Sequence, residues 1–108
     1  MRRRSFNDVS LDPVNGWLVC GEHRENLPRA AAQVLEALLA ARGNSVTGAK
    51  LRAHMRQPGH PEVSPENLGV AIYLLRRKLK RAGASTRIAN RIGYGWRLVA
   101  VTERAAAD

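Results

Sequence analysis

The spacing of apolar and polar residues divides the chain into a strand-rich first quarter and a helical middle. In the first quarter, apolar positions lie at 6–11 and 17–20, and each group is followed by turn-forming residues, at 12–16 and 21–22. Short apolar runs bounded by Gly, Pro, Asn and Asp are typical of strands joined by tight turns. Residues 6–27 are therefore predicted to form a small antiparallel meander.

Helical periodicity begins at Pro28 and predicts a first helix over residues 28–42. Its apolar residues recur at the i, i+3, i+4, i+7 spacing of one helix face: Ala31, Val34, Leu35 and Leu38. Proline is tolerated in a first turn, and Gly43 suits the end of the helix. Residues 44–46 are expected to form a short extended connection.

Two further helices are predicted from their capping residues. Thr47 can cap a helix at 48–56 that turns Leu51 and Met55 inward. The segment 57–63 contains two prolines and a glycine, which predicts a loop. Ser64 and a following proline then begin a third helix that extends to about residue 82 and stops at Gly83. The inner face of this helix is predicted to consist of Leu68, Ile72, Leu75 and Leu79.

Two strands, at 87–90 and 96–101, are predicted to close the chain as a hairpin, with Gly93 and Gly95 in the connection. The order of elements predicts an α+β fold: a winged helix-turn-helix with an N-terminal antiparallel sheet, three helices and a C-terminal β-hairpin wing. The 108 residues have room for one domain, expected over 6–101, between a flexible basic head at 1–5 and a flexible tail at 102–108.

The charge of the chain indicates a polyanionic partner. Lys and Arg number 18 against 9 Asp and Glu, which gives a net charge of +9. Residues 76–97 carry eight basic side chains and no acidic one, whereas 1–28 are balanced. A localised field of one sign favours a polyanionic partner, which can be a nucleic acid, an anionic membrane surface or an acidic protein. The alternative is a solvated helix face that keeps the protein soluble.

The third helix is predicted to present a mixed surface on the side opposite its inner face. At about 100° per residue, that side carries Glu66, Val70, Tyr73, Leu74, Arg77 and Arg81, flanked by Asn67 and Lys80. The basic end suits DNA phosphates. Three explanations remain open for the apolar residues Val70, Tyr73 and Leu74: contact with thymine methyls and base planes, a protein interface, or cover by the loop 57–63.

The predicted hairpin supplies a second basic surface. Arg87 and Arg91 lie on its first strand and Arg97 on its second. Gly93 and Gly95 allow a tight tip, and a basic tip beside a groove-binding helix is expected to sit on phosphates or in an adjacent minor groove. The predicted DNA-binding residues are Asn67, Val70, Tyr73, Leu74, Arg76, Arg77, Lys80, Arg81, Arg87, Asn90, Arg91 and Arg97.

The sequence from Phe6 to Val101 resembles the OmpR/PhoB-type winged-helix effector domain of bacterial response regulators. Residues 27–51 follow the family pattern without a gap, 70–79 resemble its recognition helix, and 93–98 resemble the hairpin that closes it. The resemblance implies transcription control through promoter DNA, usually by tandem or dimeric copies. It also implies contact between the loop 57–63 and RNA polymerase.

The chain departs from this family in three places. The family normally attaches the domain to a phosphorylated receiver, and the length leaves no room for one, so a stand-alone regulator is expected. Ala71, Tyr73 and Leu74 stand where relatives often carry basic or His side chains. The wing has Asn90 and Ile92 where Thr and Arg are common.

Other chemistries have little support in the sequence. Cys20 is the only cysteine, and its apolar context predicts a small buried hydrophobe. His23, His54 and His60 lack metal-ligand spacing, the Ser, His and acidic residues are too few and scattered to propose a catalytic triad, and the predicted helices lack paired carboxylates. No metal, cofactor or enzyme activity is therefore expected. Trp17 and Trp96 are expected in or around the core. No apolar run reaches the roughly 18–20 residues that span a bilayer, and a cytoplasmic protein associated with the bacterial nucleoid is expected.

A DNA-binding transcriptional regulator is therefore the first hypothesis. The second is a protein-interaction module that reuses the fold, such as an anti-regulator or an RNA-polymerase-binding factor of the kind a phage could encode. Its motivation is the apolar surface where bases would be read. A third is sequence-neutral binding to the nucleoid or to RNA.

Overall fold

The chain begins with a four-stranded antiparallel sheet. The computed structural model describes residues 4–12, 14–55 and 63–101. Strands β1 (Ser5–Phe6), β2 (Val9–Asp12), β3 (Trp17–Cys20) and β4 (His23–Asn26) pair in sequential order, as the predicted meander requires. The Asp12 carboxylate accepts the backbone N–H of Val14 at 2.9 Å, which stabilises the turn between β2 and β3.

Helix α1 (Arg29–Ala40) is the centre of the core and confirms the first predicted helix. Val34, Leu35 and Leu38 on its inner face are completely buried. Pro28 occupies the N-cap position rather than the first turn, because its φ of −57° is paired with an extended ψ of 151°. The helix ends where Arg42 and Gly43 both take positive φ, a conformation that breaks the α-helical path.

Helices α2 (Gly48–His54) and α3 (Pro65–Arg81) begin at the predicted caps. The Thr47 hydroxyl accepts the Lys50 N–H at 3.2 Å, and the Ser64 hydroxyl accepts the Asn67 N–H at 3.1 Å. Helix α2 is shorter than predicted, with the buried Met55 as its C-cap. Most of the predicted loop 57–63 lies outside the described residues, and Val63 packs against the core.

Helix α3 ends in a Schellman motif around Gly83. The Ala84 N–H donates to the Leu79 carbonyl at 3.1 Å, and Gly83 has a φ of +70°. Ala84 is itself buried, so the turn that leads from α3 into the next strand is packed against the domain. This motif fixes the direction in which the wing leaves the recognition-like helix.

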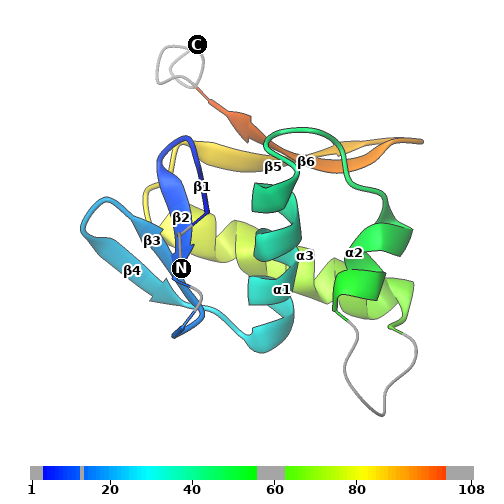
Figure 1. The fold of residues 1–108 in the computed structure, drawn as a ribbon, viewed down its shortest axis with the longest axis horizontal. Coiled ribbons are helices and arrows are strands. Elements are labelled where there is room, and N and C mark those ends of the chain that lie inside the picture. The colour runs from blue at the N-terminus through cyan, green and yellow to red at the C-terminus, as the bar shows by residue number, and fades with distance from the viewer. Residues whose placement is uncertain (1–3, 13, 56–62, 102–108) are drawn as a thin grey trace.

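The wing is the hairpin of β5 (Thr86–Arg91) and β6 (Gly95–Ala100). Ile88 and Leu98 are paired across it and face the core. Val46 forms an isolated bridge with Trp96: each backbone N–H donates to the other residue's carbonyl, at 2.7 and 2.9 Å. Figure 1 shows the hairpin running along the helices, with the four-stranded sheet at the opposite end from α2. The predicted winged helix-turn-helix is therefore confirmed.

The boundaries expected for the domain are only partly within the described residues. Strand β1 begins at Ser5, one residue inside the predicted head, and residues 1–3 and 102–108 lie outside the described part. None of the helices in the described residues is long and apolar enough to cross a membrane.

Asp8 joins the N-terminal sheet to the base of the wing. Its carboxylate accepts the Ser85 N–H at 2.6 Å and the hydroxyl of the fully buried Thr86 at 2.7 Å. Asn7, which takes a φ of +53° in the β1–β2 turn, donates to the same hydroxyl at 3.2 Å. Burial raises the pKa of Asp8, but the hydrogen bonds from Ser85 and Thr86 outweigh it and hold the pKa below 3.8.

The change Asp8→Asn is expected to destabilise the domain by about 1–2 kcal/mol at neutral pH, because the amide cannot accept both hydrogen bonds. Since the folded-state pKa lies below the unfolded value of 3.8, Asp8 stabilises the wild type above that pH. The stabilisation is lost as the pH falls through the folded-state value. Urea unfolding should show a difference between the two proteins that shrinks in acid; a constant difference would contradict this role.

Candidate nucleic-acid interface

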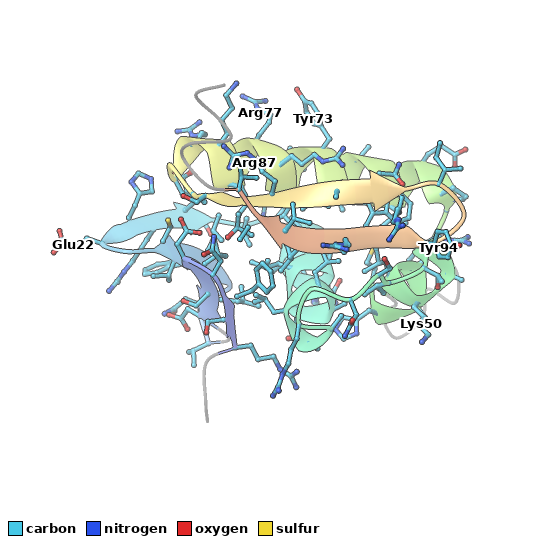
Figure 2. All side chains as sticks on the ribbon, turned by 90° about the horizontal axis from the view of Figure 1, so that it is seen from above. Glu22, Lys50, Tyr73, Arg77, Arg87 and Tyr94 are labelled. Carbon is cyan, nitrogen blue, oxygen red and sulfur yellow. The ribbon has the colours of Figure 1, made fainter. Side chains whose placement is uncertain are left out.

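The outward side of α3 presents a stripe formed by Val70, Tyr73 and Arg77. Val70 is 57% exposed and Tyr73 is 59% exposed. The Arg77 guanidinium lies over the Tyr73 ring, 5.9 Å from its centroid, in a cation–π contact. Figure 2 shows both side chains projecting from the same side of α3, away from the helix and the hairpin below it. The stripe is thus an accessible, partly apolar surface with a cation at one end.

Leu74 and Ala71, which lie next to this stripe on α3, are less exposed than its members. Leu74 is half-buried, because it lies on the flank of the helix rather than at the centre of the outward side. Ala71 is 2% exposed and belongs to the core, so it offers no surface to a partner. Asn67 is exposed near the start of the helix. The accessible apolar residues of α3 are therefore Val70 and Tyr73, fewer than predicted.

Two of the predicted DNA-binding arginines also hold the fold together. An Arg76 Nη donates to the Ile88 carbonyl at 3.0 Å and so ties α3 to β5. An Arg87 Nη donates to the Ala84 carbonyl and, at 3.1 Å, to the Thr86 carbonyl. Both side chains remain partly accessible, but part of their donor capacity serves the junction between α3 and the wing.

A carboxylate from the N-terminal sheet neutralises another part of the basic run. Glu25 on β4 lies 3.5 Å from Lys78 Nζ and 3.5 Å from Arg81 Nε, and its other oxygen lies 2.5 Å from His23 Nε2. The hydrogen bond with His23, followed by the charges of Arg81 and Lys78, lowers the pKa of Glu25 below its usual 4.5. Residues 76–97 contain no acidic residue, but in the folded domain the Glu25 carboxylate lies beside two of their cations.

Sequence reasoning missed Glu25 because its partners are distant in the chain. One signal was available. Glu25 pairs with the fully buried Leu18 across the β3–β4 ladder, so both side chains face the same side of the sheet. An acidic residue that faces the buried side of a strand indicates that a cation packs against it.

The cations with the fewest hydrogen-bonding or charged partners lie toward one edge of α3 and on the wing. Lys80 is exposed and has no charged or hydrogen-bonding partner among the described residues. Arg91 lies over Tyr94, 5.2 Å from its ring centroid. These two side chains and Arg77 are exposed and form no hydrogen bond or ion pair among the described residues, so they are the cations of the basic run most open to an anionic partner.

The register of the hairpin places three arginines on one face. Arg87 pairs with Val99, Ala89 with Arg97, and Arg91 with Gly95, on the face opposite the buried Ile88 and Leu98. Arg97 is half-buried, and its Nε is buried without a hydrogen-bond partner in the described part of the chain. Asn90 pairs with Trp96 and so points to the opposite face from the arginines.

A groove of about 590 Å³ separates the wing tip from the first turns of α2 and α3. Its walls include Gly48 and Arg52 on one side and Gly69 with Leu68 on the other. The tip residues from Asn90 to Trp96 close the third side. The tip of the wing therefore lies beside the N-terminal half of α3, and its base lies beside the C-terminal half, as the positions of Tyr94 and Arg87 in Figure 2 show.

Cys20 and the two tryptophans are all partly buried. Cys20 is half-buried against the core, not fully buried, and its thiol lies 3.6 Å from an Asp8 carboxylate oxygen. Burial and the neighbouring carboxylate raise the pKa of this thiol above 9.0. Trp96 packs against the core and Trp17 is half-buried beneath Arg24. No cluster of His, Cys, Asp and Glu among the described residues could hold a metal ion.

The architecture defines a winged helix-turn-helix domain with a basic and partly apolar recognition-like helix. The family model "Transcriptional regulatory protein, C terminal" matches residues 22–98. The chain therefore belongs to this family of OmpR/PhoB-type DNA-binding domains, which is a family of regulator domains and not of enzymes. No curated protein sequence matches the chain significantly.

Several solved structures have the same fold. The DNA-binding domain of the response regulator AdeR, in complex with an intercistronic region, is similar with a TM-score of 0.74 and 17% identity, over 87% of this chain and 96% of that one. The Klebsiella pneumoniae RstA DNA-binding domain, in complex with the RstA box, is similar with a TM-score of 0.71 and 25% sequence identity. The match covers 92% of this chain and 98% of that one. A streptococcal redox sensor evolved from two-component response regulators is similar with a TM-score of 0.74 and 21% sequence identity. The match covers 93% of this chain but 43% of the sensor.

Proposed function

We propose that this domain binds double-stranded DNA and regulates transcription, with α3 in the major groove and the β5–β6 wing on neighbouring phosphates or in the adjacent minor groove. The observation that carries the proposal is the outward stripe of α3, where the exposed Val70 and Tyr73 lie next to Arg77. An α-helix fits the major groove, and an apolar side chain there can contact the thymine methyl group.

The proposed interface divides into phosphate-binding and base-reading residues. Arg77, Lys80 and Arg91 are proposed to bind phosphates, since they are exposed and no carboxylate among the described residues neutralises them. Val70 and Tyr73 are proposed to contact base edges. The remaining predicted DNA-binding residues are proposed to lie at the margins of the interface: Asn67, Leu74, Arg76, Arg81, Arg87, Asn90 and Arg97.

A gel-shift titration against genomic fragments at several salt concentrations tests this proposal. The protein should retard a subset of fragments, and its affinity should fall as the salt concentration rises. Failure to retard any duplex at low salt would contradict DNA binding. The exposure of Val70 and Tyr73 equally suits a protein interface, so a partner that co-purifies from nuclease-treated lysate while DNA binding is absent would favour a protein-interaction module.

Thymine methyl groups are expected to contribute to sequence preference through Val70 and Tyr73. Replacing thymine by uracil in a bound duplex should weaken binding about fourfold for each contacted methyl group, since a buried methyl contributes about 0.8 kcal/mol. The variant Val70→Ala should lose part of this discrimination. Val14→Ala, which truncates an exposed valine in the β2–β3 turn, is the matched control. Equal affinity for thymine and uracil duplexes would contradict base reading by the stripe.

The family pattern extends the proposal to other partners. Tandem or dimeric copies on adjacent half-sites, and contact between the loop 57–63 and RNA polymerase, are proposed on that pattern alone. Footprint length and sedimentation of the DNA complex distinguish one bound copy from two.

A further inference from the structure

The tip of the wing presents an isoleucine to solvent. Ile92 is 95% exposed, more than any other large apolar side chain of the described residues. It follows Arg91 in a turn where the Tyr94 N–H donates to the Arg91 carbonyl at 2.9 Å. Gly93 has a φ of +85°, which the third position of a type II turn requires. Turn geometry therefore explains Gly93 but does not call for a β-branched apolar residue at position 92.

The base of this tip is anchored to the body of the domain. The hydrogen bonds between Val46 and Trp96 join the start of β6 to the residue just before α2. The Trp96 ring packs against Gly48 at the start of that helix. Ile92 is thus presented between Arg91 and Tyr94 beside the N-terminal half of α3.

We propose that Ile92 is an apolar wedge that enters the minor groove and partly unstacks one base-pair step, so that the domain bends the duplex it binds. The inference rests on the proposed DNA binding. Proteins that bend DNA from the minor groove combine cations with inserted apolar side chains. Arg91 supplies the cation, and Tyr94, 63% exposed, adds apolar surface at the same tip.

Insertion of Ile92 between bases explains why the tip carries an apolar side chain, which phosphate binding by the tip does not explain. A tip that only lies on phosphates gains from Arg91 and gains nothing from Ile92, whose side chain has no polar group. Insertion between bases buries the side chain, and this gain is offset by the cost of unstacking. The affinity is therefore expected to depend weakly on Ile92, while the bend of the DNA depends on it strongly.

The test uses the full chain and a duplex selected from a random-sequence pool by the wild-type protein. Energy transfer between dyes at the two ends reports the bend, and 2-aminopurine placed in the central steps reports unstacking. The wild type should bend the duplex by about 20–90° and raise the 2-aminopurine fluorescence at one step. Ile92→Ser should lose most of both signals with an affinity loss within about tenfold. Ile92→Leu should retain both, and Val14→Ser, at a distant exposed site, should change neither.

The outcomes separate this inference from DNA binding itself. If the wild type selects no duplex, DNA binding fails and the wedge fails with it. If the wild type binds and Ile92→Ser gives the same bend and fluorescence, DNA binding stands and the wedge is overturned. A loss of affinity with an unchanged bend also overturns it, since Ile92 would then be an ordinary surface contact.

Discussion

The change Gly95→Ala is expected to destabilise the domain by about 3–5 kcal/mol, a large part of the stability of a small domain. Gly95 has a φ of +106°, which strains any residue with a Cβ. An added Cβ would also overlap the Val46 carbonyl oxygen and lie 2.7 Å from the Val46 carbonyl carbon and 2.9 Å from Thr47 Cα. All three atoms are backbone, so the clash can be relieved only if the Val46–Trp96 bridge opens.

Gly93→Ala is the matched control for this prediction. Gly93 lies in the same hairpin with a φ of +85°, and nothing lies within 4 Å of the position of its missing Cβ. Only the strain of the left-handed conformation applies there, at about 1–2 kcal/mol. Urea denaturation of both variants measures the difference. Equal losses would show that the backbone contact with Val46 contributes nothing beyond the conformation of Gly95.

This pair of glycines shows how far the sequence predicts the wing. The sequence predicts both in the connection between two strands, since glycine is typical of tight turns. In the structure Gly93 lies in the turn, whereas Gly95 is the first residue of β6 and pairs with Arg91. The approach of Gly95 to Val46 could not be predicted, because it depends on how the α1–α2 connection packs beside the hairpin. The sequence predicts helix α3 more completely. Its cap at Ser64 and its stop at Gly83 depend on the residue types at those positions, and its buried face depends on helical periodicity.

At the candidate interface, too, some features depend on the local sequence and others depend on contacts with distant residues. The outward positions of Val70, Tyr73 and Arg77 follow from the helical repeat. The half-burial of Leu74, the carbonyl contacts of Arg76 and the carboxylate of Glu25 depend on neighbours elsewhere in the chain. A charge count along the sequence therefore overestimates the basic surface, because it assigns every cation in the run the same freedom to bind phosphate.

Arg77→Ala and Lys80→Ala together are expected to lower the affinity for every duplex by about tenfold or more, since each removes a charged contact to phosphate. The slope of log affinity against log salt concentration should become shallower by about 0.9 for each lost contact. The effect should be similar across sequences, in contrast to that of Val70→Ala. Gel shifts at several salt concentrations measure both quantities, and an unchanged slope would show that neither side chain meets a phosphate.

Lys78 provides the matched control on the same helix. Its Nζ lies 3.5 Å from Glu25, and the Lys78 side chain is 25% exposed. Lys78→Ala removes the same charge as Lys80→Ala but should leave the salt slope nearly unchanged, because the lost cation already had a carboxylate partner. Glu25→Gln should act in the opposite direction: it releases Lys78 and Arg81 to phosphates and makes the slope steeper by up to about 1.8. If Lys78→Ala and Lys80→Ala flatten the slope equally, Glu25 does not restrain this end of the interface.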